Sequence, residues 1–251
     1  MNNKQWNYFC EFRTSFKQKV LEWTSQVPQL SDLQKKAVKL AGTPDYPFEN
    51  PVVYNTDLDK ITAADDIKLI VIGDNPGKDE QLNKNQRYLC GQAGKLAEGF
   101  FKNHPELGID FRRNVIILNK TPVHSAKTAQ LKTMIKQGGP EVEALILDSQ
   151  NWMAEQTARL HQALEGTQLW LVGYSELKEG HFFCPYRDTL KSSYDASSKS
   201  WNNVYVFQHF SMNRFSIDLK TFSNQNPRLQ LMDQLTTLGT SHKNEIFIYQ
   251  K

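Results

Sequence analysis

The chain has 251 residues, enough to bury a sizeable core in one large domain or in a domain with an extension. Its 14 Phe, 9 Tyr and 5 Trp argue against disorder, and its net charge of +3 permits a polyanionic partner without requiring one. The longest apolar runs, of about five residues, are too short to span a membrane, and the N-terminus does not resemble a signal peptide, so we expect a cytoplasmic protein.

An amphipathic helix is the first predicted element. Its apolar residues recur at helical spacing and are expected to contact the core: Phe9, Phe12, Phe16, Val20 and Trp23. A second helix is predicted over about Ser31–Leu40, ending at Gly42. The prolines of Thr43–Asn55 then predict an irregular loop.

Four β-type runs follow, at Ile67–Gly73, Asn114–Lys120, Gln168–Tyr174 and Asn203–His209. The first three are apolar on both faces, as expected for strands that are covered on both sides. Helices are predicted at about Gln92–Asn103, Pro140–Gly166, after Pro185, and at Asn226–Gly239. This alternation is typical of an α/β protein in which helices connect parallel strands.

Each predicted strand is followed by polar residues. In chain order these are Asp74 and Asn75, Asn119 and Lys120, Ser175 and Glu176, and His209 and Ser211. Open parallel sheets bind ligands beyond the carboxyl ends of their strands, so we expect a site at this edge.

Positive charge is concentrated between residues 111 and 140. This segment has six basic residues and no acidic one: Arg112, Arg113, Lys120, Lys127, Lys132 and Lys136. Two interpretations stay open, a solvated surface and an edge that contacts phosphates.

Several common motifs are excluded. The segment from Gly73 to Lys78 is one residue short of a nucleotide-binding P-loop, and Asp79 stands where that loop needs Ser or Thr. The segment "GYSEL" has Leu177 in place of the second glycine of a nucleophile elbow, and no G-x-G-x-x-G is present. The three widely spaced cysteines lack zinc or cluster spacing, which indicates reduced thiols.

Four fragments between Ile67 and Phe215 resemble the uracil-DNA glycosylase superfamily. They are "GDNPG" after the first strand, "YLCGQAG" at Tyr88–Gly94, "LNKTP" at the end of the second strand, and "HFSMNRF" after the fourth. The first is similar to the G-x-N-P-G motif of the mismatch-specific and single-strand-selective branches, and the second to the "PFVGxAG" segment of the iron–sulfur branch. The resemblance implies one glycosylase-like domain over residues 1–251, a three-layer α/β/α sandwich whose four-stranded sheet is mostly parallel. The first 60 or so residues match no part of the family pattern, and we expect residues 1–62 to form an N-terminal helical extension and loop packed on this domain.

The resemblance also implies catalytic roles. Asp74 or Asn75 would hold a water over the anomeric carbon and stabilise an oxocarbenium-like sugar, and the sequence leaves the choice between them open. His209 would donate a hydrogen bond to the departing base, and Asn119 would bind the Watson–Crick edge of an extruded base. Tyr88 would stack on the base, unless the alignment on "PFVGxAG" places Leu89 there instead.

Further contacts follow from the same motifs. Base contacts are expected at Gly73, Pro76 and Gly77, and DNA contacts at Lys78, Gly91, Gly94, Lys120, Ser211, Met212 and Arg214. Phe210 and Phe215, with Met212 and Arg214, are candidates for a wedge that fills the gap left by the extruded base.

The chain departs from the family pattern at three points. Phe210 and Met212 replace both prolines of H-P-S-P, Gly77 stands where one branch has an aromatic that excludes thymine, and the cluster cysteines are missing. We therefore expect a monomeric DNA glycosylase without metal or cofactor that removes uracil or another deaminated base. Two alternatives remain open: a non-catalytic member that binds nucleic acid or a nucleobase, and a hydrolase of free nucleosides or nucleotides.

Overall fold

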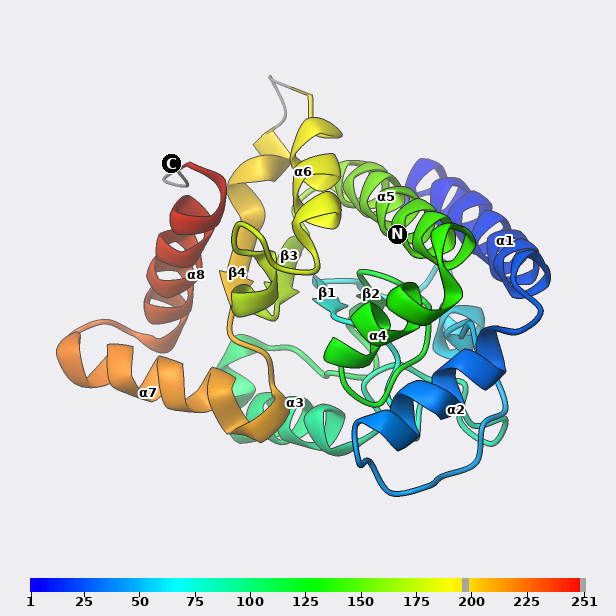
Figure 1. The fold of residues 1–251 in the computed structure, drawn as a ribbon. Coiled ribbons are helices and arrows are strands. Elements are labelled where there is room, and N and C mark those ends of the chain that lie inside the picture. The colour runs from blue at the N-terminus through cyan, green and yellow to red at the C-terminus, as the bar shows by residue number, and fades with distance from the viewer. Residues whose placement is uncertain (196–198, 249–251) are drawn as a thin grey trace.

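The computed structural model describes residues 1–195 and 199–248, and a parallel four-stranded sheet lies at its centre (Figure 1). The strands are β1 (Leu69–Gly73), β2 (Val115–Asn119), β3 (Gln168–Val172) and β4 (Val204–Phe207). Their order is β2-β1-β3-β4, and every neighbouring pair is parallel. All four predicted strands are confirmed, and all four carboxyl ends meet at one edge because the strands are parallel.

Eight α-helices occur in the described residues. They are α1 (Asn3–Gln26), α2 (Leu30–Leu40), α3 (Gln92–Asn103), α4 (Ala129–Gly138), α5 (Pro140–Ala163), α6 (Cys184–Ser192), α7 (Arg214–Gln225) and α8 (Leu231–Phe247). The helix predicted at Gln92–Asn103 has the predicted bounds, whereas the last helix begins and ends later than predicted. Helices α4 and α7 were not predicted from the sequence.

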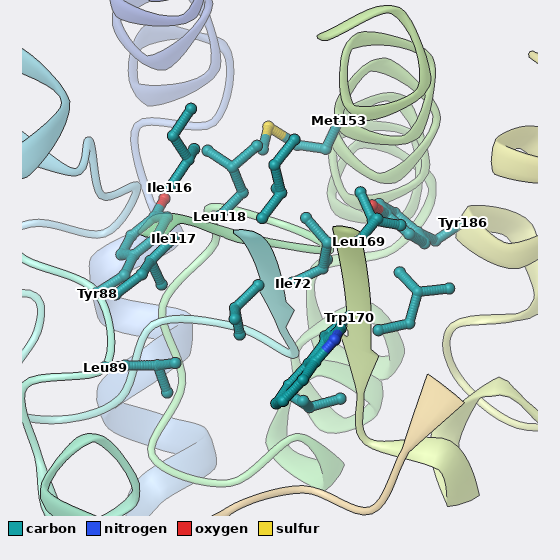
Figure 2. Packing of buried hydrophobic residues seen from close by; sticks show 14 of the residues in the cluster. Ile72, Tyr88, Leu89, Ile116, Ile117, Leu118, Met153, Leu169, Trp170 and Tyr186 are labelled. Atoms are coloured by element: carbon teal, nitrogen blue, oxygen red, sulfur yellow. The ribbon is translucent and has the colours of Figure 1, made fainter. Parts of the chain in front are cut away.

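Helices cover both faces of the sheet, which makes the protein a three-layer α/β/α sandwich. On one face Trp170 of β3 stacks on Phe101 of α3 and Phe215 of α7. On the other face Met153 of α5 is fully buried, and Figure 2 shows Met153 and Trp170 on opposite sides of the strands. Successive residues of a strand face opposite sides, so strands covered in this way must be apolar throughout.

The N-terminal segment is joined to this core. The predicted stripe of α1 is buried, and its rings pack on Trp152 of α5, with the Trp23 and Trp152 centroids 5.6 Å apart. The Trp23 indole also donates to Asp148 at 2.7 Å. Helix α2 packs along α4, and Val52 pairs with Val123 in an isolated bridge. In the described part of the chain no helix combines the length and apolarity needed to cross a bilayer.

Candidate active site

An open cleft of about 760 Å³ lies at the carboxyl ends of the strands. Each strand delivers at least one residue to its wall: β1 is followed by Asp74, β2 ends at Asn119, β3 is followed by Gly173, and β4 leads to His209. The predicted convergence of polar strand ends is therefore observed. Among the described residues no cluster of three or more His, Cys, Asp or Glu side chains has the arrangement of a metal site.

Asp74 is held by a buried lysine. The Lys120 side chain is fully buried, and its Nζ lies 2.5 Å from Asp74 Oδ1 and 2.6 Å from the Val172 carbonyl. The ring of Phe183 lies 5.1 Å from the same ammonium. The prediction that Lys120 contacts DNA is therefore wrong, because its charge is directed inward to compensate Asp74.

Two glycines make room for these side chains. A Cβ at Gly73 would lie 2.4 Å from Asn119 Oδ1, and a Cβ at Gly173 would lie 2.3 Å from Asp74 Oδ1. Gly173 also has a φ of +94°, a conformation that L side chains rarely adopt. Gly73 does not itself line the cleft, so its predicted base contact is replaced by this packing role.

Asn75 is used to hold a loop. Its Nδ2 donates to the backbone oxygen and the hydroxyl of Ser125, both at 2.9 Å, and its Oδ1 accepts from the Thr128 hydroxyl at 3.2 Å. Both the oxygen and the nitrogen of the amide thus hydrogen-bond to the loop that precedes α4. Asp74, in contrast, has an oxygen, Oδ2, for which no hydrogen bond to a described residue is found, and its side chain is 14% exposed in the cleft.

His209 has one defined neutral tautomer. The Ser211 backbone N–H donates to His209 Nδ1 at 3.1 Å, so Nδ1 is an acceptor and the proton of the neutral ring resides on Nε2. Burial lowers the pKa of His209; the Asp74 carboxylate opposes this effect and the Lys120 ammonium adds to it. The ring is thus a neutral N–H donor at physiological pH. Ser211, predicted to contact phosphate, instead uses its N–H and its hydroxyl on this ring.

Asn119 has a hydrogen-bond donor without a partner. The residue is 2% exposed and lines the cleft, and its Nδ2 is buried with no acceptor among the described residues. An unsatisfied buried N–H costs roughly 1–3 kcal/mol, and a ligand carbonyl could recover this free energy.

Tyr88 is not the base platform. It is fully buried, its hydroxyl donates to the Val53 carbonyl at 2.5 Å, and Figure 2 shows it among the core side chains. Leu89 lines the cleft instead, as the alternative alignment expected. The backbone turns at Leu89, which has a φ of +48°, and this turn sends the tyrosine inward.

Other predicted contacts take structural roles. Pro76 is buried outside the cleft wall, and its carbonyl accepts from the Ser125 N–H at 3.1 Å. Gly94 is also buried, and a Cβ there would overlap the Leu89 carbonyl oxygen, at 1.6 Å. Neither can make the predicted contact with a base or a phosphate. Phe210 and Phe215 are buried as well, which removes them as wedges.

Glu80 is a site residue that the sequence analysis did not assign. It lines the cleft, is 7% exposed, and its burial raises its pKa to about 8 although the backbone groups of Gly77 and Leu89 bond to it. Its carboxyl group is therefore largely neutral at pH 7. The spacing of the motif does not distinguish it from the exposed Asp79, so only its burial could have identified it.

Exposed basic residues outnumber exposed acidic ones along the rim of the cleft, where Asp79 is the exposed acid. Lys78, Lys127 and Arg214 are exposed along it, and Gly77 and Gly91, predicted to contact the base and the DNA, also line the cleft. Helices α3, α4 and α7 all begin at this rim, and none of their N-terminal residues receives a side-chain cap. Backbone N–H groups at helix N-termini favour anions, and in α4 those of Gln130 and Leu131 already donate to the Lys127 and Thr128 carbonyls. Met212 is 69% exposed at the same rim, in a left-handed conformation with φ +54°.

No protein-family model, curated protein or solved structure matches this chain.

Proposed function

We propose that the protein is a metal-independent DNA glycosylase that hydrolyses the N-glycosidic bond of an extruded, deaminated pyrimidine, with uracil as the first candidate. One observation carries the proposal: Asp74, Asn119 and His209 line the same cleft. His209 is a neutral Nε2–H donor, and the buried Nδ2 of Asn119 has no acceptor among the described residues. The motif resemblance over residues 67–215 is consistent with these assignments. With three unpaired cysteines, the protein would act in the reducing cytoplasm.

Each group has a role in the reaction. The C1′–N bond breaks and its electron pair goes to the base, while water adds its oxygen to C1′. Asp74 orients this water, stabilises the cationic sugar and accepts the proton that the water loses. His209 Nε2–H donates to the base oxygen on which negative charge develops, and a neutral donor does this without being deprotonated. The released base then takes a proton from solvent.

The recognition of the base is assigned to two residues. Asn119 Nδ2 would donate to a carbonyl on the Watson–Crick edge of the base. This hydrogen bond would satisfy the donor that has no partner within the described part of the protein. The neutral carboxyl group of Glu80 can approach a base without placing a charge beside it. The basic rim favours a nucleotide within a DNA strand over a free nucleoside, because phosphates on both sides would contact it.

The test is a cleavage assay. Labelled single- and double-stranded oligonucleotides carrying one uracil, hypoxanthine or xanthine are incubated with the protein and then with alkali, which breaks the strand at an abasic site. Strand scission is expected for wild type and for Glu155→Gln, an exposed α5 acid outside the cleft. Asp74→Asn is expected to abolish it, and His209→Ala to slow it about 100-fold or more, the size of effect seen for a lost oxyanion donor.

The result also decides between the alternatives. Absence of scission on all substrates, with salt-sensitive binding retained, would refute hydrolysis and indicate a protein that binds nucleic acid. Absence of both would leave the free-nucleoside hydrolase, which release of base from deoxyuridine would then test.

A further inference from the structure

A second concavity lies beside the cleft, on the N-terminal segment. It has a volume of about 440 Å³ and lies between α2 and the loop that follows it; we call it the α2 groove. Its lining comprises Lys35, Lys36, Lys39, Asp45, Tyr46 and Phe48. No sequence motif assigns a function to residues 35–48, which form this groove.

The chemistry of the α2 groove combines positive charge with a flat aromatic surface. The three lysines are exposed, and the single lining acid is Asp45. Tyr46 and Phe48 stack with ring centroids 4.5 Å apart and planes 25° apart, and both rings are partly exposed. Aromatic faces beside lysines are the arrangement with which proteins hold unpaired nucleotides, because the bases stack while the phosphates contact the cations.

The groove and the cleft are linked by one contact between their lining residues. Lys78 lines the cleft, and its ammonium lies 5.8 Å from the centroid of the Tyr46 ring, which lines the groove. A strand with one nucleotide in the cleft would therefore pass Lys78 before it reaches the aromatic pair. A shared cation between the two concavities suits a continuous polyanion better than two separate ligands.

The aromatic pair is held in place by the catalytic loop. The Tyr46 hydroxyl lies 2.9 Å from His124 Nε2, and His124 Nδ1 lies 2.8 Å from the Pro76 carbonyl. Because a carbonyl only accepts, Nδ1 carries the proton and Nε2 accepts from the tyrosine. Burial lowers the pKa of His124 to about 4, which keeps this chain of hydrogen bonds in one arrangement at physiological pH.

Two buried glutamines fix the rest of the loop. Gln81 Oε1 accepts from the Glu49 N–H at 2.7 Å, and Gln81 Nε2 donates to the Pro47 carbonyl at 2.6 Å. Gln34 of α2 donates to the Pro51 carbonyl at 2.9 Å. The groove is thus formed before any ligand arrives, and preorganisation reduces the entropy that binding costs.

We propose that the α2 groove binds the unpaired DNA that flanks the nucleotide in the cleft, with one base stacked on the Tyr46–Phe48 pair and its phosphates beside Lys35, Lys36 and Lys39. This inference rests on the proposed function for the identity of the strand. We expect single-stranded DNA to be the preferred form, because both faces of a base within a duplex are stacked on neighbouring base pairs and are not accessible to the aromatic pair.

Binding is measured by fluorescence anisotropy with a labelled thymidine oligonucleotide that contains no deaminated base, so that excision plays no part. Lys35→Gln/Lys36→Gln/Lys39→Gln removes only exposed charges and should weaken binding at 50 mM salt at least tenfold. It should also reduce the slope of log K against log salt by about 2, since each lost phosphate contact on a single strand contributes roughly 0.7. The matched control, Lys4→Gln/Lys102→Gln/Lys199→Gln, removes three exposed charges outside both concavities and should retain the slope.

Stacking is tested separately with Phe48→Leu, which keeps an apolar side chain and is expected to weaken binding about tenfold with an unchanged salt slope, because base stacking is independent of counterions. Circular dichroism and the urea midpoint confirm that each variant is folded. Equal affinity of the triple groove variant and its control would overturn the proposal, as would equal affinity of wild type for duplex and single strand. Binding of polyglutamate as tight as that of the oligonucleotide would also overturn it, in favour of an acidic protein partner.

The two proposals fail in different ways. Groove-dependent binding without excision would refute the glycosylase and retain the groove. Excision with binding that is insensitive to the groove variants would retain the glycosylase and refute the groove.

Discussion

Replacing Lys120 by methionine removes the cation that holds Asp74 while keeping a buried side chain of similar length. The Lys120 side chain is fully buried, whereas that of Asp74 is 14% exposed, so the variant leaves a carboxylate that only cleft water can partly solvate. Breaking a buried ion pair from one side costs about 3–5 kcal/mol. Because Asp74 keeps some contact with water, we expect the free energy of unfolding to fall by the lower end of this range, about 3 kcal/mol. For a chain of this size such a loss lowers Tm by roughly 6–12 °C.

A double-mutant cycle isolates the ion pair from the other contacts of Lys120. The ammonium also donates to the Val172 carbonyl, and that loss persists in every variant without the lysine. Adding Asp74→Asn to Lys120→Met removes the uncompensated charge, so we expect the double variant to recover about 2 kcal/mol relative to Lys120→Met. Urea unfolding at pH 7 measures all four proteins. A loss below about 1 kcal/mol for Lys120→Met, or additive effects of the two substitutions, would refute this account of the pair.

Three further predictions concern the same site. Gly173→Ala forces a side chain to φ +94° and places its Cβ 2.3 Å from Asp74 Oδ1, so we expect a loss of about 1–3 kcal/mol in urea unfolding together with loss of excision. Burial raises the pKa of Glu80 to about 8, so between pH 4.5 and 8 the unfolded chain releases a proton that the folded protein retains. Stability should therefore fall as pH rises, by up to about 1.4 kcal/mol per pH unit from this group. Glu80→Gln should lack this pH dependence. The measurement compares the urea midpoints of wild type and Glu80→Gln at pH 5, 6, 7 and 8, and a difference that stays constant over this range would contradict the prediction. Nitrogen-15 NMR of the imidazoles should show His209 as the neutral Nε2–H tautomer at pH 7, and a protonated ring or an Nδ1–H signal would contradict its assigned role.

The sequence predicted the sheet because its strands are apolar on both faces, a pattern that only burial between two layers explains. It did not predict α4 or α7. In α4 the buried Leu131 and Met134 stand among basic and polar residues. The positive charge of the segment indicates a charged surface, and two apolar residues are too few to predict a helix. In α7 the residues just before the helix, Met212 and Asn213, have positive φ, and Asn213 at the N-cap makes no side-chain cap hydrogen bond.

The site was predicted from the residues that follow each strand. The predictions that were wrong concern the direction in which a side chain points. Lys120 directly follows the last residue of β2, and its direction decides between DNA and the core. Tyr88 and Leu89 are adjacent, and the left-handed backbone of Leu89 decides which one lines the cleft. Neither direction is encoded in residue type or spacing. Both depend on tertiary packing, by Phe183 against Lys120 and by the Val53 carbonyl at Tyr88.

We propose Asp74 rather than Asn75 as the group that holds the water, on the basis of the hydrogen bonds that each side chain makes. The Asn75 amide is fixed by the loop that precedes α4, because its Oδ1 accepts from Thr128 and its Nδ2 donates to Ser125, which leaves one lone pair of Oδ1. Releasing it would break the link between the loop after β1 and the start of α4. Asp74 has an oxygen to spare, and the Lys120 ammonium supports its negative charge without occupying that oxygen. A fixed carboxylate beside a developing sugar cation stabilises it by charge as well as by positioning water, which an amide cannot do. The acid at the second position of the motif is therefore the group to which we assign the chemistry, and the amide at the third position keeps the loop in place.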